Sequence, residues 1–93
     1  MISRYEENPG RKSIIIHQQE RDGYYQFSGY FIATRSAIDK FGEETIKVCH
    51  ILLQEQVKEK GGLDYLQVFE IDGQKLWFID DVTHVTCLLP SDY

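Results

Sequence analysis

The sequence predicts an α+β fold class, in which one long helix packs on one face of an antiparallel sheet of about five strands. Three observations support it. A strand-turn-strand pattern surrounds Asp72-Gly73, an amphipathic run occupies residues 43–60, and further β-branched or aromatic runs lie on either side of these two. The expected order is β-β-α-β-β-β, and 93 residues should form a single domain.

The N-terminal part predicts an arm followed by a hairpin. Residues 1–11 are polar and contain a Pro-Gly turn signal, so we expect a loose N-terminal arm. Residues 12–19 are rich in β-branched side chains and residues 24–34 in aromatic ones, so these two runs should pair across a turn. Gly29 interrupts the second run, which predicts a bulge or a bend there.

The middle of the chain has helical signals. Ser36 and Asp39 resemble a capping box and predict a short helical turn ending near Gly42. The main helix should occupy residues 43–60, with acidic residues at its start, basic residues at its end and a glycine C-cap. The stripe that should face the sheet comprises Ile46, Cys49, Leu53 and Val57, widened by His50 and Leu52.

Residues 63–81 predict the central hairpin. Asp72 and Gly73 tolerate the positive φ of a two-residue type I′ turn, and such a short loop fixes the register. The expected pairs are Ile71/Gln74, Glu70/Lys75, Phe69/Leu76, Val68/Trp77, Gln67/Phe78 and Leu66/Ile79. Because side chains alternate between faces, both faces of this hairpin are apolar, and each needs a cover. A second turn at Asp80-Asp81 should lead into a last strand over residues 82–89, which Pro90 ends.

Composition narrows the class of protein. With 42% hydrophobic and 27% charged residues, the chain resembles an ordinary folded soluble domain. No apolar run approaches the roughly 20 residues of a membrane span, and the start lacks the apolar core of a signal peptide, so we expect no membrane association and a cytoplasmic location. Cys49 and Cys87 lie outside any CxxC motif, which argues against a disulfide scaffold or a zinc finger.

The charge of −5 is unevenly distributed along the chain. Residues 1–60 carry nine acidic and nine basic side chains, whereas residues 61–93 carry six acidic side chains against Lys75 alone. Direct binding to nucleic acid is disfavoured there, because it draws on clustered Lys and Arg. A partner protein with a basic surface is the better match, although acidity could also serve solubility alone.

Two stretches resemble a known family. Tyr30, Thr34 and Arg35, within GYFIATR, and residues 64–70, DYLQVFE, are similar to a family of small uncharacterised proteins from staphylococci and other Firmicutes. The resemblance covers about the middle half of the chain. The chain departs from the family pattern in its extra N-terminal strands and in its C-terminal strand. Since members often travel on mobile elements, it implies a phage or mobile-element setting and no particular chemistry.

Metal and nucleophile hypotheses find little support. Cys49 and His50 are adjacent on a helix, and His84 and Cys87 project to opposite faces of a strand, so neither pair readily shares an ion. We predict no metal site, no cofactor and no catalytic residues, and hence that the chain is not an enzyme. The alternative that stays open is a small enzyme or metal-dependent hydrolase that uses His84, Cys87 or the pair of carboxylates Asp80 and Asp81.

The aromatic and acidic residues of the sheet carry the functional prediction. Six Tyr and one Trp are more than a small core hides, and such residues are enriched at protein interfaces. We therefore expect a non-enzymatic protein-binding module. More specifically, we expect an inhibitor of a host defence nuclease, such as an anti-CRISPR-like protein that blocks a nucleic-acid-binding effector. A homodimer with a structural role is a further alternative. The predicted partner-binding residues are Tyr24, Tyr25, Tyr65, Glu70, Asp72, Asp80 and Asp81.

Overall fold

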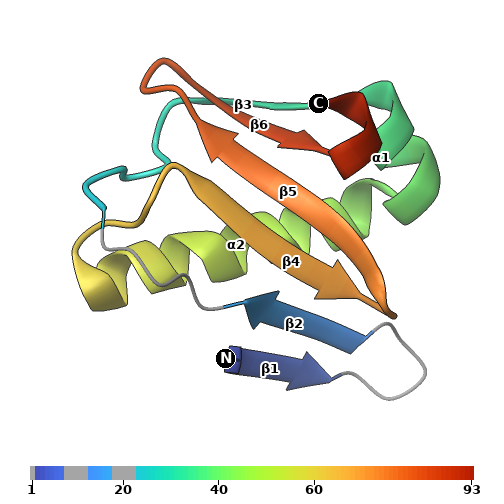
Figure 1. The fold of residues 1–93 in the computed structure, drawn as a ribbon, viewed down its shortest axis with the longest axis horizontal. Helices are drawn as coiled ribbons and strands as arrows, with labels where there is room; N and C mark the ends of the chain where they lie inside the picture. Colours follow the sequence, from blue (N-terminus) through green and yellow to red (C-terminus); the bar gives the residue numbers. More distant parts are fainter. Residues whose placement is uncertain (1, 8–12, 18–22) are drawn as a thin grey trace.

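A computed structural model of the chain describes residues 2–7, 13–17 and 23–93. In this part of the chain, helix α2 crosses one face of a sheet, and α1 lies at one end (Figure 1). The elements are β1 (Ile2–Glu7), β2 (Ser13–His17), β3 (Tyr30–Ala33), α1 (Arg35–Phe41), α2 (Glu43–Lys60), β4 (Leu66–Ile71), β5 (Gln74–Asp80), β6 (His84–Leu88) and the 3₁₀ turn η1 (Pro90–Asp92).

The described strands form one six-stranded sheet in the order β1-β2-β4-β5-β6-β3. The α+β class is confirmed. The purely antiparallel sheet is wrong, because β3 runs parallel to β6 while the other neighbours are antiparallel. A crossover through α1 and α2 separates β3 from β4, and this connection lets β3 enter the sheet at the edge beyond β6.

The expected hairpin between residues 12–19 and 24–34 is also wrong. Strand β2 pairs with β1 and β4, whereas β3 lies at the opposite edge of the sheet. The run between them bends before β3 begins: Phe27 adopts a positive φ of 51° with its ring fully buried. Gly29 then passes so close to β6 that an added Cβ would lie 2.5 Å from the carbonyl oxygen of Thr83.

The N-terminal arm differs from the expectation. Residues 2–7 form the edge strand β1, antiparallel to β2, where the polar composition predicted a loose segment. Without β1, strand β2 would be the edge of the sheet and would expose unpaired N–H and C=O groups. The backbone of residues 2–7 can pair with these groups, and such pairing does not require apolar side chains. Residues 1 and 8–11 of the expected arm lie outside the described residues.

Local signals were correct at the centre of the chain. Every predicted pair of the β4-β5 hairpin is observed, and Asp72 and Gly73 have the positive φ values that the turn needs. Helix α2 has the predicted bounds, and Gly61 caps it in the left-handed conformation. A second helix was only partly foreseen: α1 begins after Thr34, whose Oγ1 accepts a hydrogen bond from the backbone N–H of Ala37 at 3.2 Å, so the N-cap is Thr34 and not Ser36.

One core fills the space between α2 and the sheet. Its members on α2 include Ile46, Cys49, Leu53 and Val57, which confirms the predicted stripe. The sheet contributes alternate residues of each described strand from β2 onward, among them Ile14, Ile16, Phe69, Ile71, Leu76, Phe78, Val85 and Cys87. Phe27 seals one end of this core.

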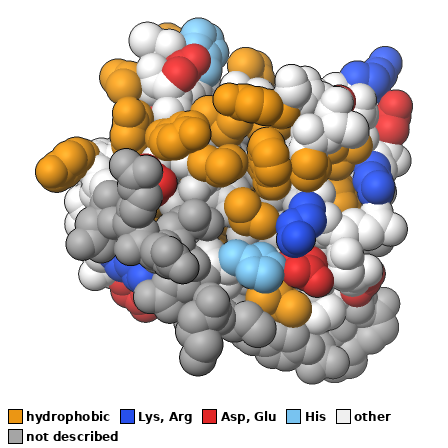
Figure 2. Space-filling view, in the orientation of Figure 1, with side chains coloured by type: hydrophobic (Ala, Val, Ile, Leu, Met, Phe, Trp, Pro, Cys, Tyr) orange, Lys and Arg blue, Asp and Glu red, His pale blue; other side chains and the backbone are white. Residues whose placement is uncertain are grey.

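The other face of the sheet, opposite α2, is here called the open face. Its half-buried or exposed apolar side chains are Ile15, Tyr30, Ile32, Leu66, Val68, Trp77 and Ile79, and Leu88, opposite Trp77, is buried. Figure 2 shows hydrophobic side chains gathered on this side over the central strands. The short η1 and Tyr93 lie against one part of it, with the Tyr93 ring 5.7 Å from that of Trp77, and neither α1 nor α2 covers it.

Candidate binding surfaces

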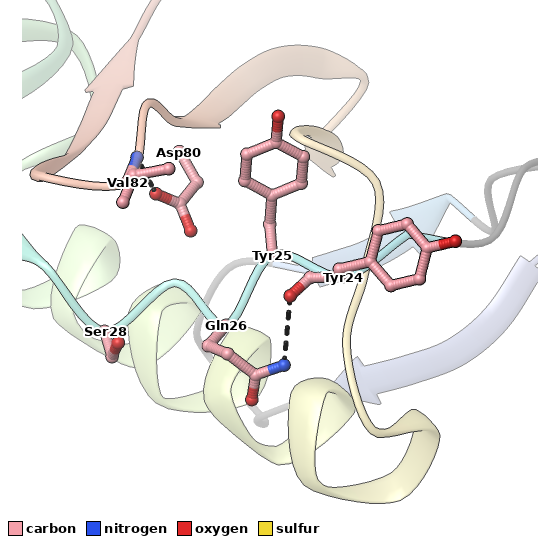
Figure 3. Close-up of a pocket in the computed structure, with 6 residues that line it drawn as sticks. All are labelled: Tyr24, Tyr25, Gln26, Ser28, Asp80 and Val82. Carbon is pink, nitrogen blue, oxygen red and sulfur yellow. Dashed lines mark hydrogen bonds between the residues drawn. The ribbon is translucent and has the colours of Figure 1, made fainter.

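A hollow of about 380 Å³ opens beside the turn between β5 and β6, and we call it the Asp80 hollow. Its lining combines three polar and three largely apolar side chains: Tyr24, Tyr25, Gln26, Ser28, Asp80 and Val82. Figure 3 shows that the first four come from the loop before β3 and the last two from the end of β5 and the turn after it. Segments more than 50 residues apart therefore build one site.

Asp80 is the structural centre of this hollow. Only 4% of it is exposed, and both carboxylate oxygens accept backbone hydrogen bonds: Oδ2 from Phe27 at 2.8 Å and Oδ1 from Val82 at 2.7 Å. Phe27 and Val82 both have positive φ, 51° and 84°, which is unusual for side chains of their kind. Asp80 thus holds two strained loops together. The sequence suggested that Asp80 is an exposed contact residue, but in the structure its side chain is buried.

The tyrosines stand around the same hollow. Tyr25 forms an antiparallel bridge with Leu63, with both backbone hydrogen bonds at 2.9–3.0 Å, and its ring meets Tyr65 edge-on at 6.3 Å. Tyr24 is 91% exposed. Gln26 fixes the loop, because its Nε2 donates to the carbonyl oxygens of Tyr24 and Gly61.

Asp81 is exposed next to Asp80 and organises the turn. Its Oδ1 accepts hydrogen bonds from the backbone N–H of His84 at 2.7 Å and from the N–H and hydroxyl of Thr83. These bonds, that to His84 first, hold the pKa of the Asp81 carboxyl below its usual value. The side chain is therefore a fixed negative charge in the turn that follows Asp80.

Glu70 and Asp72 lie toward the other end of the hairpin, away from these groups. Glu70 Oε1 is 2.8 Å from His17 Nε2, and Asp72 Oδ1 accepts a hydrogen bond from the backbone N–H of Ser13 at 3.0 Å. The structure thus brings together Tyr24, Tyr25, Tyr65, Asp80 and Asp81, and separates Glu70 and Asp72 from them. The latter two help to hold β2 against β4.

The open face is the larger candidate surface, and sequence analysis did not identify its residues as a site. The one sequence signal for this surface was that both faces of the β4-β5 hairpin are apolar, which indicated that something must cover the second face. The face is widened because β2 pairs with β4 on one side of the central hairpin and β3 pairs with β6 on the other, and neither pairing had a local sequence signal. A second hollow of about 460 Å³ lies on it, lined by His17, Val68, Lys75, Trp77 and Pro90.

The thiols and imidazoles are dispersed. Cys49 and Cys87 are buried and free, and burial raises the pKa of Cys49 to about 12 and that of Cys87 further still, which suppresses the nucleophilic thiolate. His84 lies on the open face and Cys87 in the core, as their spacing predicted. Among residues 2–7, 13–17 and 23–93, no group of three or more His, Cys, Asp or Glu side chains is placed to hold a metal ion.

Comparison of the chain with protein-family models, with curated proteins and with solved structures finds no match. The similarity to the Firmicute family thus stays a prediction from two short stretches. Within the described residues, neither helix combines the length and the apolar character needed to cross a bilayer.

Proposed function

We propose that this chain is a non-enzymatic protein-binding module that holds its partner against the open face. The observation that carries the proposal is the apolar character of that face in the described structure, with Ile32 49% exposed and Trp77 only half-buried. Contiguous apolar surface of this kind, rimmed by polar groups, is typical of interaction sites. His17, Glu70 and Lys75 supply the polar groups among the strands.

The charge distribution supports a partner with a basic surface. Of the six carboxylates after residue 60, Asp72, Asp81 and Asp92 are exposed, and each already accepts a hydrogen bond from this chain, which fixes its position. Fixed negative charges steer a basic partner and lose no side-chain entropy on contact. In its finer form, the proposal is that the partner is a nucleic-acid-binding effector, such as a defence nuclease, whose basic surface this mobile-element protein occupies.

The test compares two isoleucines of nearly equal exposure on opposite sides of the molecule. Ile32 on β3 lies on the open face, and Ile51, 52% exposed, lies on the side of α2 turned away from the core. Tagged wild-type protein, Ile32→Lys and Ile51→Lys are each passed through a nuclease-treated bacterial lysate, and the bound proteins are identified by mass spectrometry.

We expect one protein to be retained by wild type and by Ile51→Lys, and lost with Ile32→Lys, because a buried lysine at an apolar contact costs several kcal/mol. Release of that protein by added DNA or RNA would support the inhibitor form. Retention by all three proteins would contradict the use of the open face, and recovery of nothing above background by wild type would contradict the binding function.

A further inference from the structure

We propose that the Asp80 hollow binds the guanidinium or ammonium group of an Arg or Lys side chain on a polypeptide. The inference rests on the proposed protein-binding function and names the chemical group that the partner presents. The hollow has the two features that recognise such a group, a partly desolvated carboxylate and aromatic walls.

The carboxylate of Asp80 has acceptor capacity left. Each carboxylate oxygen can accept two hydrogen bonds, and in the structure one backbone N–H, from Phe27 or from Val82, donates to each. These two bonds also fix the orientation of the carboxylate, so that a ligand need not order it. Because Asp80 is only 4% exposed, its attraction for a cation is less screened than that of a surface carboxylate.

Two tyrosines supply the walls. Tyr25 is held in place by its backbone bridge to Leu63 and by the ring of Tyr65. Tyr24 is part of the lining and is 91% exposed; its ring points away from Asp80 in Figure 3, and a change of rotamer would bring it over an entering side chain. Cations are attracted to the faces of aromatic rings, and a guanidinium stacks on them as well.

The remaining lining suits the stem of a long basic side chain. Val82 is 72% exposed at the rim and offers apolar contact for methylene groups, while Gln26 and Ser28 are exposed polar neighbours. No Lys or Arg lines the hollow among the described residues, and the charge of Asp81 adjoins it. An anionic group would meet these two carboxylates, so the hollow discriminates by charge.

The strained backbone agrees with a binding role. Val82 is β-branched, and a β-branched residue at a φ of 84° is a conformational outlier. Such strain persists where surrounding structure imposes it, and it is concentrated at binding sites. Here the carboxylate that imposes the strain on Val82 and Phe27 is the group proposed to bind the cation.

The direct test is a titration of the isotope-labelled protein followed by amide chemical shifts. The probes are Nα-acetyl-arginine amide and its neutral isostere Nα-acetyl-citrulline amide. We expect the arginine probe to shift amides of residues 24–28 and of Val82, with a dissociation constant on the order of millimolar, and citrulline to leave them unchanged. Equal shifts with both probes, or shifts spread over all exposed carboxylates, would overturn the proposal.

Variants locate the site. Tyr24→Ala should weaken binding of the arginine probe by about two- to fivefold, whereas Tyr93→Ala, which removes another highly exposed tyrosine far along the chain, should not change it. Asp80→Asn should weaken binding by about tenfold or more. If Asp80→Asn does not fold, Tyr24→Ala decides, and unchanged binding in that variant contradicts the inference.

The outcome also separates this inference from the proposed function. If the protein captured from lysate is retained by Tyr24→Ala and lost with Ile32→Lys, while no probe binds, the cation site is wrong and the binding module stands. If the arginine probe binds but wild type captures no protein, the hollow is a cation site and the protein-binding function is contradicted.

Discussion

At the scale of single residues, His50 is a half-buried side chain with one unsatisfied ring nitrogen. Its ring stacks on that of Phe31 at 4.2 Å with 17° between the planes, and Nε2 is buried with no hydrogen-bond partner among the residues that the structure describes. Burial disfavours the imidazolium and lowers the pKa of His50 below its ordinary value of 6.5. The folded protein therefore keeps this ring neutral at pH values at which the unfolded chain protonates it.

This linkage predicts the effect of pH on stability. Above about pH 7 neither state carries the proton, and His50 has no pH-dependent effect. As the pH falls below about 6.5, the unfolded state binds a proton that the folded state does not, so the free energy of unfolding decreases until the lower, folded pKa is reached. His50→Phe keeps the stacking and removes this proton.

The measurement is urea denaturation of both proteins, followed by Trp77 fluorescence, from about pH 8 to about pH 5. His50→Phe should be more stable by about 1 kcal/mol at the upper end, since it removes an unsatisfied buried nitrogen. Its advantage should grow as the pH falls. A constant difference across the range would show that His50 titrates alike in both states, contrary to the prediction.

The residues in and around the Asp80 hollow differ in how well the sequence alone could predict their roles. The tyrosines and Asp81 were recognisable from residue type, because exposed Tyr and turn Asp recur for known physical reasons. The role of Asp80 was not, since a carboxylate that binds the backbone of a loop 53 residues earlier is indistinguishable in sequence from one at a turn. Only the fold reveals that its charge is buried.

At the scale of elements, Thr34 connects three segments. Its Oγ1 accepts from the N–H of Ala37 as the N-cap of α1, and donates to Asp92 Oδ2 at 2.7 Å. The same Asp92 oxygen accepts from the N–H of Leu89 at 3.0 Å, where β6 passes into η1. The bond to Thr34, ahead of that to Leu89, holds the pKa of Asp92 low, so the carboxylate is ionised in this contact at neutral pH.

We predict that Thr34→Ala lowers the free energy of unfolding by about 1–2 kcal/mol, because it removes a helix cap and a charge-assisted hydrogen bond together. Ser36→Ala is the comparison: the sequence pattern suggested Ser36 as the cap, but the structure places it inside α1 and exposed, where its side chain adds only the weakest of the hydrogen bonds to Asp92. Its loss should cost clearly less than that of Thr34, about 0.5 kcal/mol. Chemical denaturation measures both, and the opposite order would contradict the observed cap.

Elements with a local signal were predictable, and those without were not. The β4-β5 register follows from two turn residues, and α2 from its periodicity and caps, so both agree with the structure. The partners of β2 and β3 depend on contacts between distant segments. Proximity along the chain favoured pairing them together, but Gly29 fits against β6 and Phe27 into the core.

At the scale of the whole molecule, the placement of β3 decides what the open face is. Had the expected hairpin formed, residues 24–34 would have extended the sheet beside residues 12–19. Instead β3 extends it beyond β6, so that Ile32 continues the apolar surface of Ile79 across Thr86. The core lies between the other face and the residues of α2, α1 and Phe27. One face of the sheet therefore stabilises the fold, and the open face is the one that we propose for contact with a partner.

This arrangement predicts the state of association of the protein on its own. A second copy could in principle cover the open face, but a stable interface buries about 800 Å² on each partner, and each copy brings a net charge of −5. The pair of Glu70 and His17 also interrupts the apolar surface and would have to be desolvated in a self-contact. We therefore expect a monomer in sedimentation velocity from about 10 to about 200 µM at moderate salt.

A concentration-dependent dimer would contradict this expectation, and the isoleucine variants would then identify its interface. If Ile32→Lys abolished the dimer and Ile51→Lys did not, the open face would be a self-interface, and a foreign partner would have to displace the second copy. If both variants left the dimer intact, association would lie elsewhere and the open face would stay free. The monomer that we expect leaves the face accessible at the concentrations used for capture from lysate.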